Sequence, residues 1–145
     1  MASDTHIKFE GVDGEATHKD HKGEIEIMSW SWGVANASHT SGGGSGRGKG
    51  VPGDLTFMHH YDKASPVLAK KCAQGVHFPT VVVTSRKSGE GQKDFLKIAL
   101  KEVFITSVQP SGSANGEIME SVSMSYGDIE FTYKPQDAKG GFGGD

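Results

Sequence analysis

Apolar and polar residues alternate along much of the chain, which is the pattern of β-strands with one buried face. Ile7 and Phe9 alternate with polar neighbours, the stretch 96–100 repeats the pattern, and residues 80–84 are β-branched throughout. Two dipeptides of the kind that hairpin turns use, at 13–14 (Asp-Gly) and 115–116 (Asn-Gly), separate such stretches. The pattern therefore predicts many short strands joined by turns.

The alternation changes phase within the strand that starts at Ile25. Apolar residues occupy odd positions up to Ile27 and even positions from Met28 to Val34, with serines between them. A similar change follows Gly127 near the C-terminus. A β-bulge would restore a single buried face. Without a bulge, each face would be buried in turn, once against the core and once against a neighbour.

One stretch alone is expected to form a helix, residues 65–74. Ser65 suits the N-cap position, Pro66 suits the first helical position, and Gly75 is a natural residue just beyond the C-terminus. The helix is short, so tertiary packing must stabilise it.

These elements predict an all-β fold with one short α-helix, arranged as a two-sheet β-barrel or sandwich. The chain has 145 residues, and many of its 21 glycines gather in the stretches 42–50 and 140–144. No repeat or domain boundary is visible. We expect residues 1–136 to form one domain and residues 137–145 to form a flexible, glycine-rich C-terminal tail.

The net charge and the cysteine content reduce the number of binding sites and cross-links that the chain can have. The formal net charge is −3 and there is a single cysteine, which argues against a polyanion-binding surface, a disulfide or a cysteine-based zinc cluster. No apolar run approaches the ~20 residues that span a bilayer, and the polar start lacks the pattern of a signal peptide. We expect neither nucleic-acid binding nor membrane insertion.

The glycine-rich stretch 43–50 nearly matches a P-loop, but Gly50 replaces the hydroxyl residue that reaches Mg²⁺. A P-loop must also open a helix, whereas Pro52 and a strand-like stretch follow here. The stretch is therefore interpreted as a long loop, whose Arg47 and Lys49 can contact an acidic neighbour.

The other candidate reactive groups have structural interpretations. The seven histidines, including His59 and His60 on opposite faces of one strand, are interpreted as surface or capping residues. Cys72 lies near a helix C-terminus, where the dipole disfavours a thiolate, so it is interpreted as a structural thiol. Glu120 and nearby carboxylates are expected on the solvent face of a strand. No catalytic residue, metal site or cofactor site is predicted.

The ordered motifs of the chain resemble those of the Hcp family, the haemolysin-coregulated proteins of bacterial type VI secretion systems. The most specific motif is Ile-Met-Ser-Trp-Ser-Trp-Gly at 27–33, with the glycine-rich loop behind it. Asp-Lys-Ala-Ser-Pro at 62–66, Cys-Ala-Gln-Gly-Val-His-Phe-Pro at 72–79 and Phe-Thr-Tyr-Lys-Pro-Gln at 131–136 also match. The matches run in family order over nearly the whole chain, and residues 137–145 carry none.

The resemblance implies a small two-sheet barrel with a flanking helix, like a phage tail-tube protein. It also implies hexameric rings that stack into a tube, which a contractile sheath propels out of the cell. Family members carry small effector proteins in the lumen and meet the spike protein VgrG at the tip. The protein would be structural rather than enzymatic, made in the bacterial cytoplasm and secreted to the extracellular space or a target cell.

The ring hypothesis suggests roles for particular residues. One face of the stretch 28–34 would pack in the core, while Ser29 and Ser31 on the other face would line the pore and contact effectors. The loop would reach the next ring or the sheath, and other residues would be structural. The loop residues are Gly42, Gly43, Gly44, Arg47 and Lys49; the structural residues are Trp30, Trp32, Ser65, Pro66 and Gly75.

A competing hypothesis is a monomeric β-barrel that binds a ligand or an oligonucleotide through Trp30, Trp32 and Phe57. Base stacking needs exposed aromatic rings beside a basic groove. The negative net charge and the alternation of both tryptophans on one strand face favour a buried role instead.

Overall fold

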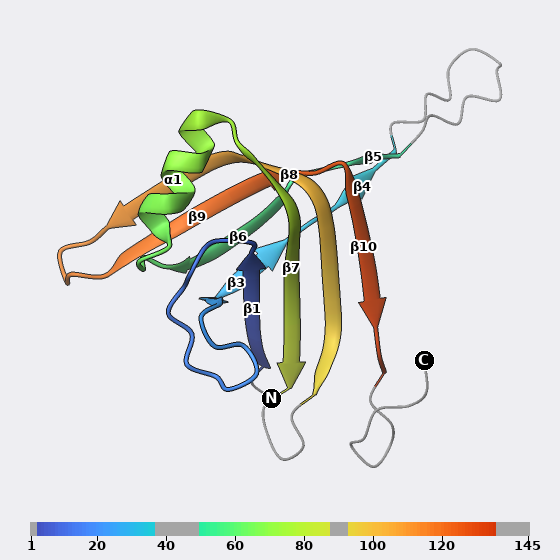
Figure 1. Ribbon diagram of the computed structural model, residues 1–145, viewed down its shortest axis with the longest axis horizontal. Helices are drawn as coiled ribbons and strands as arrows, with labels where there is room; N and C mark the ends of the chain where they lie inside the picture. The colour runs from blue at the N-terminus through green and yellow to red at the C-terminus, as the bar shows by residue number, and fades with distance from the viewer. Residues whose placement is uncertain (1–2, 37–49, 88–92, 136–145) are drawn as a thin grey trace.

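The computed structural model describes residues 3–36, 50–87 and 93–135. These residues form strands and a single helix, as predicted (Figure 1). In chain order the elements are β1 (Ser3–Phe9), β2 (Ile25–Ile27), β3 (Ser29–Ser31), β4 (Val34–Ala35), β5 (Val51–Pro52), β6 (Leu55–His60), α1 (Ser65–Gln74), β7 (His77–Lys87), β8 (Asp94–Gly112), β9 (Ile118–Ser125) and β10 (Asp128–Tyr133).

The main sheet curls into a barrel. Its strands follow the order β2-β1-β7-β8-β9-β6-β3, with every pair antiparallel. Only Met28 separates β2 from β3 in the chain, so the path returns to its start. Figure 1 shows β1, β7, β8 and β10 as one layer, crossed by a second layer that contains β3, β6 and β9. The predicted all-β barrel with one short helix is confirmed.

Two parts extend beyond the closed barrel. Strand β10 pairs with the first half of β8, where Phe131 lies opposite Ile98. Strands β4 and β5 form a separate two-stranded ribbon, which projects away from the barrel (Figure 1). Both parts lack a partner strand on one side among the described residues, so each is a candidate contact surface.

The phase change at Met28 marks a change of partner strand. Ile25 and Ile27 are 1% and 6% exposed beside β1, whereas Met28 is 55% exposed. The Met28 backbone N–H donates to the Met58 carbonyl at 2.7 Å, and from this point the chain pairs with β6. Neither a bulge nor double burial is needed, because the strand crosses from one layer of the barrel to the other.

A second irregularity lies in β8, which serves both layers. Leu100 and Val103 are both buried although three positions separate them, and Glu102 between them has φ 54. Here β8 changes partner, since its first half pairs with β10 and its second half with β9. The register shift, which is typical of a β-bulge, lies just beyond, between Ile105 and Ser107. Gly127 passes close by, since a Cβ there would lie 3.2 Å from the Glu102 Cβ.

The helix forms where it was predicted, with one correction at its start. Gly75 has φ 67 and ends the helix in the left-handed conformation, and Pro66 lies in the first turn. Ser65 is not the N-cap, because Ala64 holds that position and Ser65 is already helical. Instead, the Ser65 Oγ accepts the Asp62 N–H at 3.1 Å, while an Asp62 carboxylate oxygen accepts the Ala64 N–H.

The two predicted turns differ in outcome. Asn115 and Gly116 do form the turn between β8 and β9, with Gly116 at φ 89. After β1 the chain turns at Gly11, with φ 82, rather than at the predicted Asp-Gly pair. Gly14 serves a close approach instead, because a Cβ there would lie 2.5 Å from the Glu24 carbonyl oxygen.

Candidate functional site

One outer wall of the barrel carries short uncharged side chains, and we call it the serine-rich face. Register places its members side by side across β3, β6, β9 and the second half of β8. The exposed Asp54 precedes β6 at its margin and accepts the Thr106 hydroxyl at 2.8 Å, but the face itself contains no Asp, Glu, Lys or Arg. Its members are Ser29, Met58, Ser121 and Gln109 in one row; Ser31, Thr56, Ser123 and Ser107 in the next; His60, Met119 and Ser111 in a third; and Ser125 with Phe104.

Ser29 and Ser31 are exposed at the edge of this face. Strand alternation points them away from Trp30, which packs against the core. Within the face, the hydroxyls of Thr56 and Ser123 lie 2.9 Å apart and form a hydrogen bond. The face can therefore offer hydroxyl groups and small apolar contacts without strong ion pairing.

The tryptophans occupy the seam between the barrel and its extensions. Both are partly buried against the core. The Trp32 ring lies 4.9 Å from the Phe131 ring and its Nε1–H donates to the Tyr126 hydroxyl, which donates to the Gly53 carbonyl at 2.7 Å. Trp32 thus ties the base of the ribbon to β10. The expectation that the whole apolar face of 28–34 packs in the core is wrong for its ends, because Met28 and Val34 are exposed.

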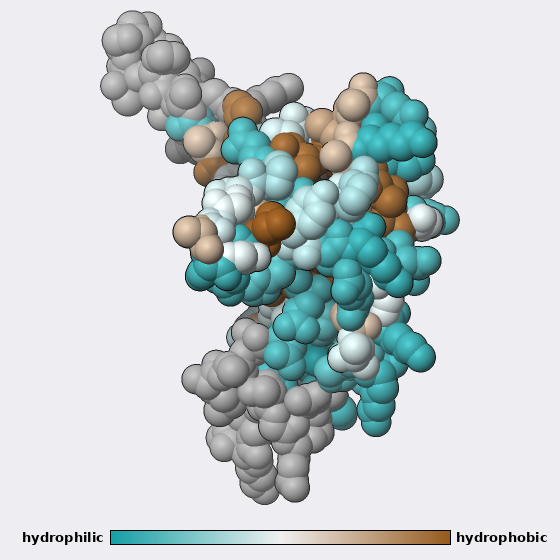
Figure 2. Space-filling model, turned by 90° about the vertical axis from the view of Figure 1, so that its left-hand side faces the viewer, coloured by the Kyte–Doolittle hydropathy of each residue, from teal (hydrophilic) through white to brown (hydrophobic). Residues whose placement is uncertain are grey.

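Apolar side chains are exposed on both extensions. On the ribbon, Val34 and Val51 are 59% and 66% exposed. On β10, Phe131 and Tyr133 are 40% and 63% exposed and line a groove against the start of β8. Figure 2 shows brown hydrophobic atoms reaching one side of the molecule in separate patches rather than in a single large one. The pairs of neighbouring apolar side chains on the ribbon and on β10 are therefore candidates for contact surfaces that a partner covers.

A buried polar pair, His59 and Glu120, corrects the sequence analysis. They lie opposite each other on β6 and β9, 0% and 1% exposed, and His59 Nε2 is 2.8 Å from the Glu120 carboxylate. The predictions of a surface histidine and a solvent-facing Glu120 are therefore wrong. Glu120 is in phase with the buried Val122 and Met124, and that phase was the available signal.

A second polar group, built around the buried His6, His21 and Arg86, joins the loop 12–24 to β1, β7 and β8. We call it the histidine–arginine cluster; it comprises His6, His18, Asp20, His21, Glu24, Arg86 and Asp94. The surface or capping role predicted for the histidines fails here too, since His6 and His21 are 2% and 7% exposed. Spacing could not reveal a cluster whose members come from four parts of the chain.

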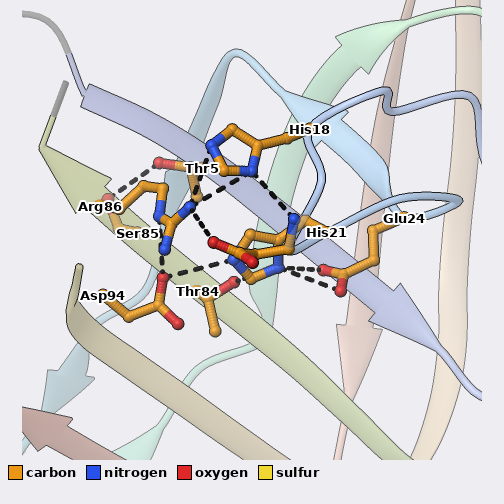
Figure 3. Close-up of polar contacts among 9 residues, drawn as sticks. Thr5, His18, His21, Glu24, Thr84, Ser85, Arg86 and Asp94 are labelled. Atoms are coloured by element: carbon orange, nitrogen blue, oxygen red, sulfur yellow. Dashed lines mark hydrogen bonds and ion pairs between the residues drawn. The ribbon is translucent and has the colours of Figure 1, made fainter. Parts of the chain in front are cut away.

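Arg86 and His21 organise the cluster (Figure 3). The Arg86 guanidinium donates to Asp20 at 3.1 Å and pairs with Asp94 at 3.2 Å. The His21 ring has Nδ1 at 3.0 Å from Glu24 and Nε2 at 3.3 Å from Asp94. The hydrogen bond from Arg86 lowers the pKa of the Asp20 carboxyl below its usual value, so Asp20 stays ionised.

The remaining candidate residues form neither a base-stacking site nor a metal site in the described part of the chain. Phe57 is 1% exposed and is not available to stack on a base. Cys72 is a free, partly buried thiol that packs against the core. In residues 3–36, 50–87 and 93–135, no cluster of His, Cys, Asp or Glu is arranged to hold a metal ion. Gly42, Gly43, Gly44, Arg47 and Lys49 lie outside the described residues.

Comparisons with known proteins agree with this architecture. Residues 6–133 match the family described as "Type VI secretion system effector, Hcp". The protein hcp1 of Pseudomonas aeruginosa is 43% identical over 143 residues, which cover 97% of this chain and 88% of that protein. No helix in the described part of the chain is long and apolar enough to cross a membrane.

Solved structures show the same fold. A structure described as a type six secretion system protein superposes with a TM-score of 0.92 at 33% identity, covering 99% of this chain and 91% of that one. Hcp1 from Salmonella typhimurium superposes with a TM-score of 0.80 at 34% identity, covering 98% and 91% of the two chains. With family, sequence and structural similarity in agreement over nearly its whole length, this chain belongs to the Hcp family of type VI secretion system effectors.

Proposed function

We propose that this chain is a non-enzymatic tube subunit, which forms hexameric rings that stack and carry small effector proteins in their lumen. The observation that carries the proposal is the serine-rich face, a broad wall without ionic side chains on a protein of net charge −3. A lumen of this chemistry holds its cargo through many weak, reversible contacts, because it forms no strong ion pairs with it.

The lumen position of Ser29 and Ser31 is part of this proposal. Both are exposed at the edge of the serine-rich face and present hydroxyls that can both donate and accept hydrogen bonds. Secretion by the type VI system would then deliver the ring together with its cargo from the bacterial cytoplasm to the outside or to a target cell.

Ring closure needs two different surfaces on each subunit, because a head-to-tail interface joins unlike patches. The ribbon, with exposed Val34 and Val51, supplies one, and the groove beside Phe131 and Tyr133 supplies the other. We assign ring contacts to these surfaces. The stretch 42–50 lies between β4 and β5 in the sequence, and we propose that it contacts the next ring or the sheath, while VgrG meets the tube at its end.

The first test is the absolute mass in solution, by light scattering behind a sizing column. A particle of six subunits of 15.4 kDa is expected, whereas a monomer at high concentration contradicts the ring.

Thiol labelling then tests the surfaces in a Cys72→Ala background. In the intact ring, Ser31→Cys should react with a bulky maleimide, whereas Val51→Cys should be protected. An unreactive Ser31→Cys contradicts its place in the lumen.

A further inference from the structure

The loop 12–24, between β1 and β2, is anchored by the buried Val12 and Ala16 near its start and by polar side chains over the rest of its length. His18 and Asp20 contact Arg86 of β7, and His21 contacts Asp94 at the start of β8 (Figure 3). Within the loop, backbone hydrogen bonds link Gly14 to Gly23 and Ala16 to Glu24. The loop therefore forms a unit that keeps its own internal bonds and is tied to the barrel through histidine and arginine contacts.

His6 lies beneath this loop without a hydrogen-bond partner. Its ring stacks on His21 with centroids 4.8 Å apart and planes 10° apart, and it lies 6.0 Å from His18. Neither of its ring nitrogens, which are fully buried, has a partner. An imidazolium at this position would present two N–H groups to no acceptor, and burying an unpaired charge is strongly unfavourable.

Three of the four carboxylates around His6 are already engaged. Asp20 and Asp94 bind Arg86, and Glu24 and Asp94 bind His21. Glu24 and Glu26, the latter directly opposite His6 on β2, attract a proton to His6, whereas His21 and His18 oppose it. These groups, with Arg86, are the titratable and charged neighbours of His6 on the packed elements. A further proton in the cluster adds a cation beside carboxylates of which Asp20, Glu24 and Asp94 already bind Arg86 or His21.

We propose that loop 12–24 is an acid-released latch, in which proton uptake by His6 drives His18 and His21 away from the histidine–arginine cluster and frees the loop from the barrel. Burial, followed by the proximity of His21, lowers the pKa of His6 below its ordinary value of 6.5. The latch is therefore closed at neutral pH and opens only in a mildly acidic medium.

Opening the latch changes a neighbouring surface. Glu15 of the loop accepts the Lys63 N–H at 2.6 Å, next to the start of α1. Residues 15–17 also line a groove together with Met28, His60 and Tyr61, at the edge of the serine-rich face. Release of the loop would remove one wall of this groove. The inference does not depend on ring formation, since every contact in it lies within one chain.

Hydrogen exchange read by mass spectrometry tests the latch, at about pH 7.5 and about pH 5 with correction for intrinsic exchange rates. Opening of peptides that cover 12–24 should rise at least about tenfold on acidification, while β8 peptides stay protected. His6→Phe keeps an aromatic ring in the stack and removes the titration, so its loop should stay closed at both pH values. His77→Phe, which replaces an exposed histidine on β7, should respond like the unchanged protein.

Three results would overturn the latch: no acid response in the unchanged protein, an unchanged response in His6→Phe, or loss of protection in β8 together with the loop. The last result would mean global acid unfolding rather than local release. Circular dichroism at neutral pH checks that His6→Phe folds. If it does not, His6→Gln supplies the same comparison, because glutamine is neutral at both pH values and fits a polar site.

Discussion

His59 and Glu120 form a polar contact inside an apolar wall. Both side chains are essentially unexposed, and Phe57 lies beside His59 with ring centroids 5.4 Å apart. Burying such groups is favourable only while they satisfy each other, because removal of one leaves the other without a partner. The contact therefore links β6 to β9 in a way that a single substitution cannot replace.

Glu120→Leu should lower the free energy of unfolding by about 3 kcal/mol, because His59 is left buried and unpaired. The double variant His59→Leu/Glu120→Leu should recover most of this loss, since an apolar pair suits the site. Urea unfolding of the three proteins and of His59→Leu closes the double-mutant cycle. A loss that the double variant does not recover would show that packing, rather than pairing, sets the cost.

His6 should make stability depend on pH. Its pKa is lowered in the folded state, so between the two pKa values the unfolded chain binds more protons. Stability is therefore full above the ordinary pKa of 6.5 and falls as pH decreases below it, until the folded protein also takes up the proton. Urea midpoints over this range should fall in the unchanged protein and fall less in His6→Phe. Equal slopes would contradict a contribution from His6.

For single residues, the sequence showed which side chains are polar but not which of them are buried. Alternation placed Val122 and Met124 of β9 on one face, and Glu120 follows the same phase. The general tendency of carboxylates to face solvent overrode that signal. His6 is the reverse case, since it precedes the buried Ile7 in an alternating strand and is buried only because the loop 12–24 covers the other face of β1.

Local sequence determines where the helix α1 ends, whereas contacts with the preceding chain determine where it begins. Its end was predicted from Gly75 alone, because the left-handed conformation there suits glycine. Its start depends on the chain before it. There the Asp62 N–H donates to the Ser65 Oγ and the Ala64 N–H donates to the Asp62 carboxylate, in place of a bond from an N-cap side chain. Capping residues are readable from sequence, but which of two adjacent positions holds the cap depends on such contacts.

Gly75→Ala should destabilise the fold by about 1 kcal/mol, because a Cβ disfavours positive φ even where space is open. Gly33→Ala is the matched control, since Gly33 is also exposed and open but lacks a positive φ. Its effect should stay within about 0.5 kcal/mol. Thermal unfolding of both variants compares them directly, and equal effects would show that the φ angle of Gly75 is not the cause.

The strands were easier to predict than their partners. Alternation located β1, β6 and β9, but the crossing at Met28 depends on which neighbours flank each half of the strand. The barrel closes because β2 pairs with β1 and β3 pairs with β6, and these pairings determine where the chain crosses. Contacts between residues distant in sequence decide it, and no local pattern contains them.

The whole molecule exposes apolar side chains where its closed barrel ends. Met28, Val34, Val51, Phe131 and Tyr133 are all at least 40% exposed, although buried positions for apolar residues are plentiful in the core. A monomer gains nothing from exposed valines on a two-stranded ribbon, which is marginally stable by itself. The arrangement is explained if neighbouring copies cover both extensions.

Val51→Glu should therefore block ring assembly while leaving the barrel folded. The side chain is 66% exposed on β5, so the charge costs little in the isolated chain but would be buried in a ring contact. Light scattering should report a monomer, and circular dichroism an unchanged fold. Ala69→Glu, at an exposed position of α1, adds the same single negative charge and should still assemble. A Val51→Glu protein that retains the full mass of the unchanged ring would place the interface away from the ribbon.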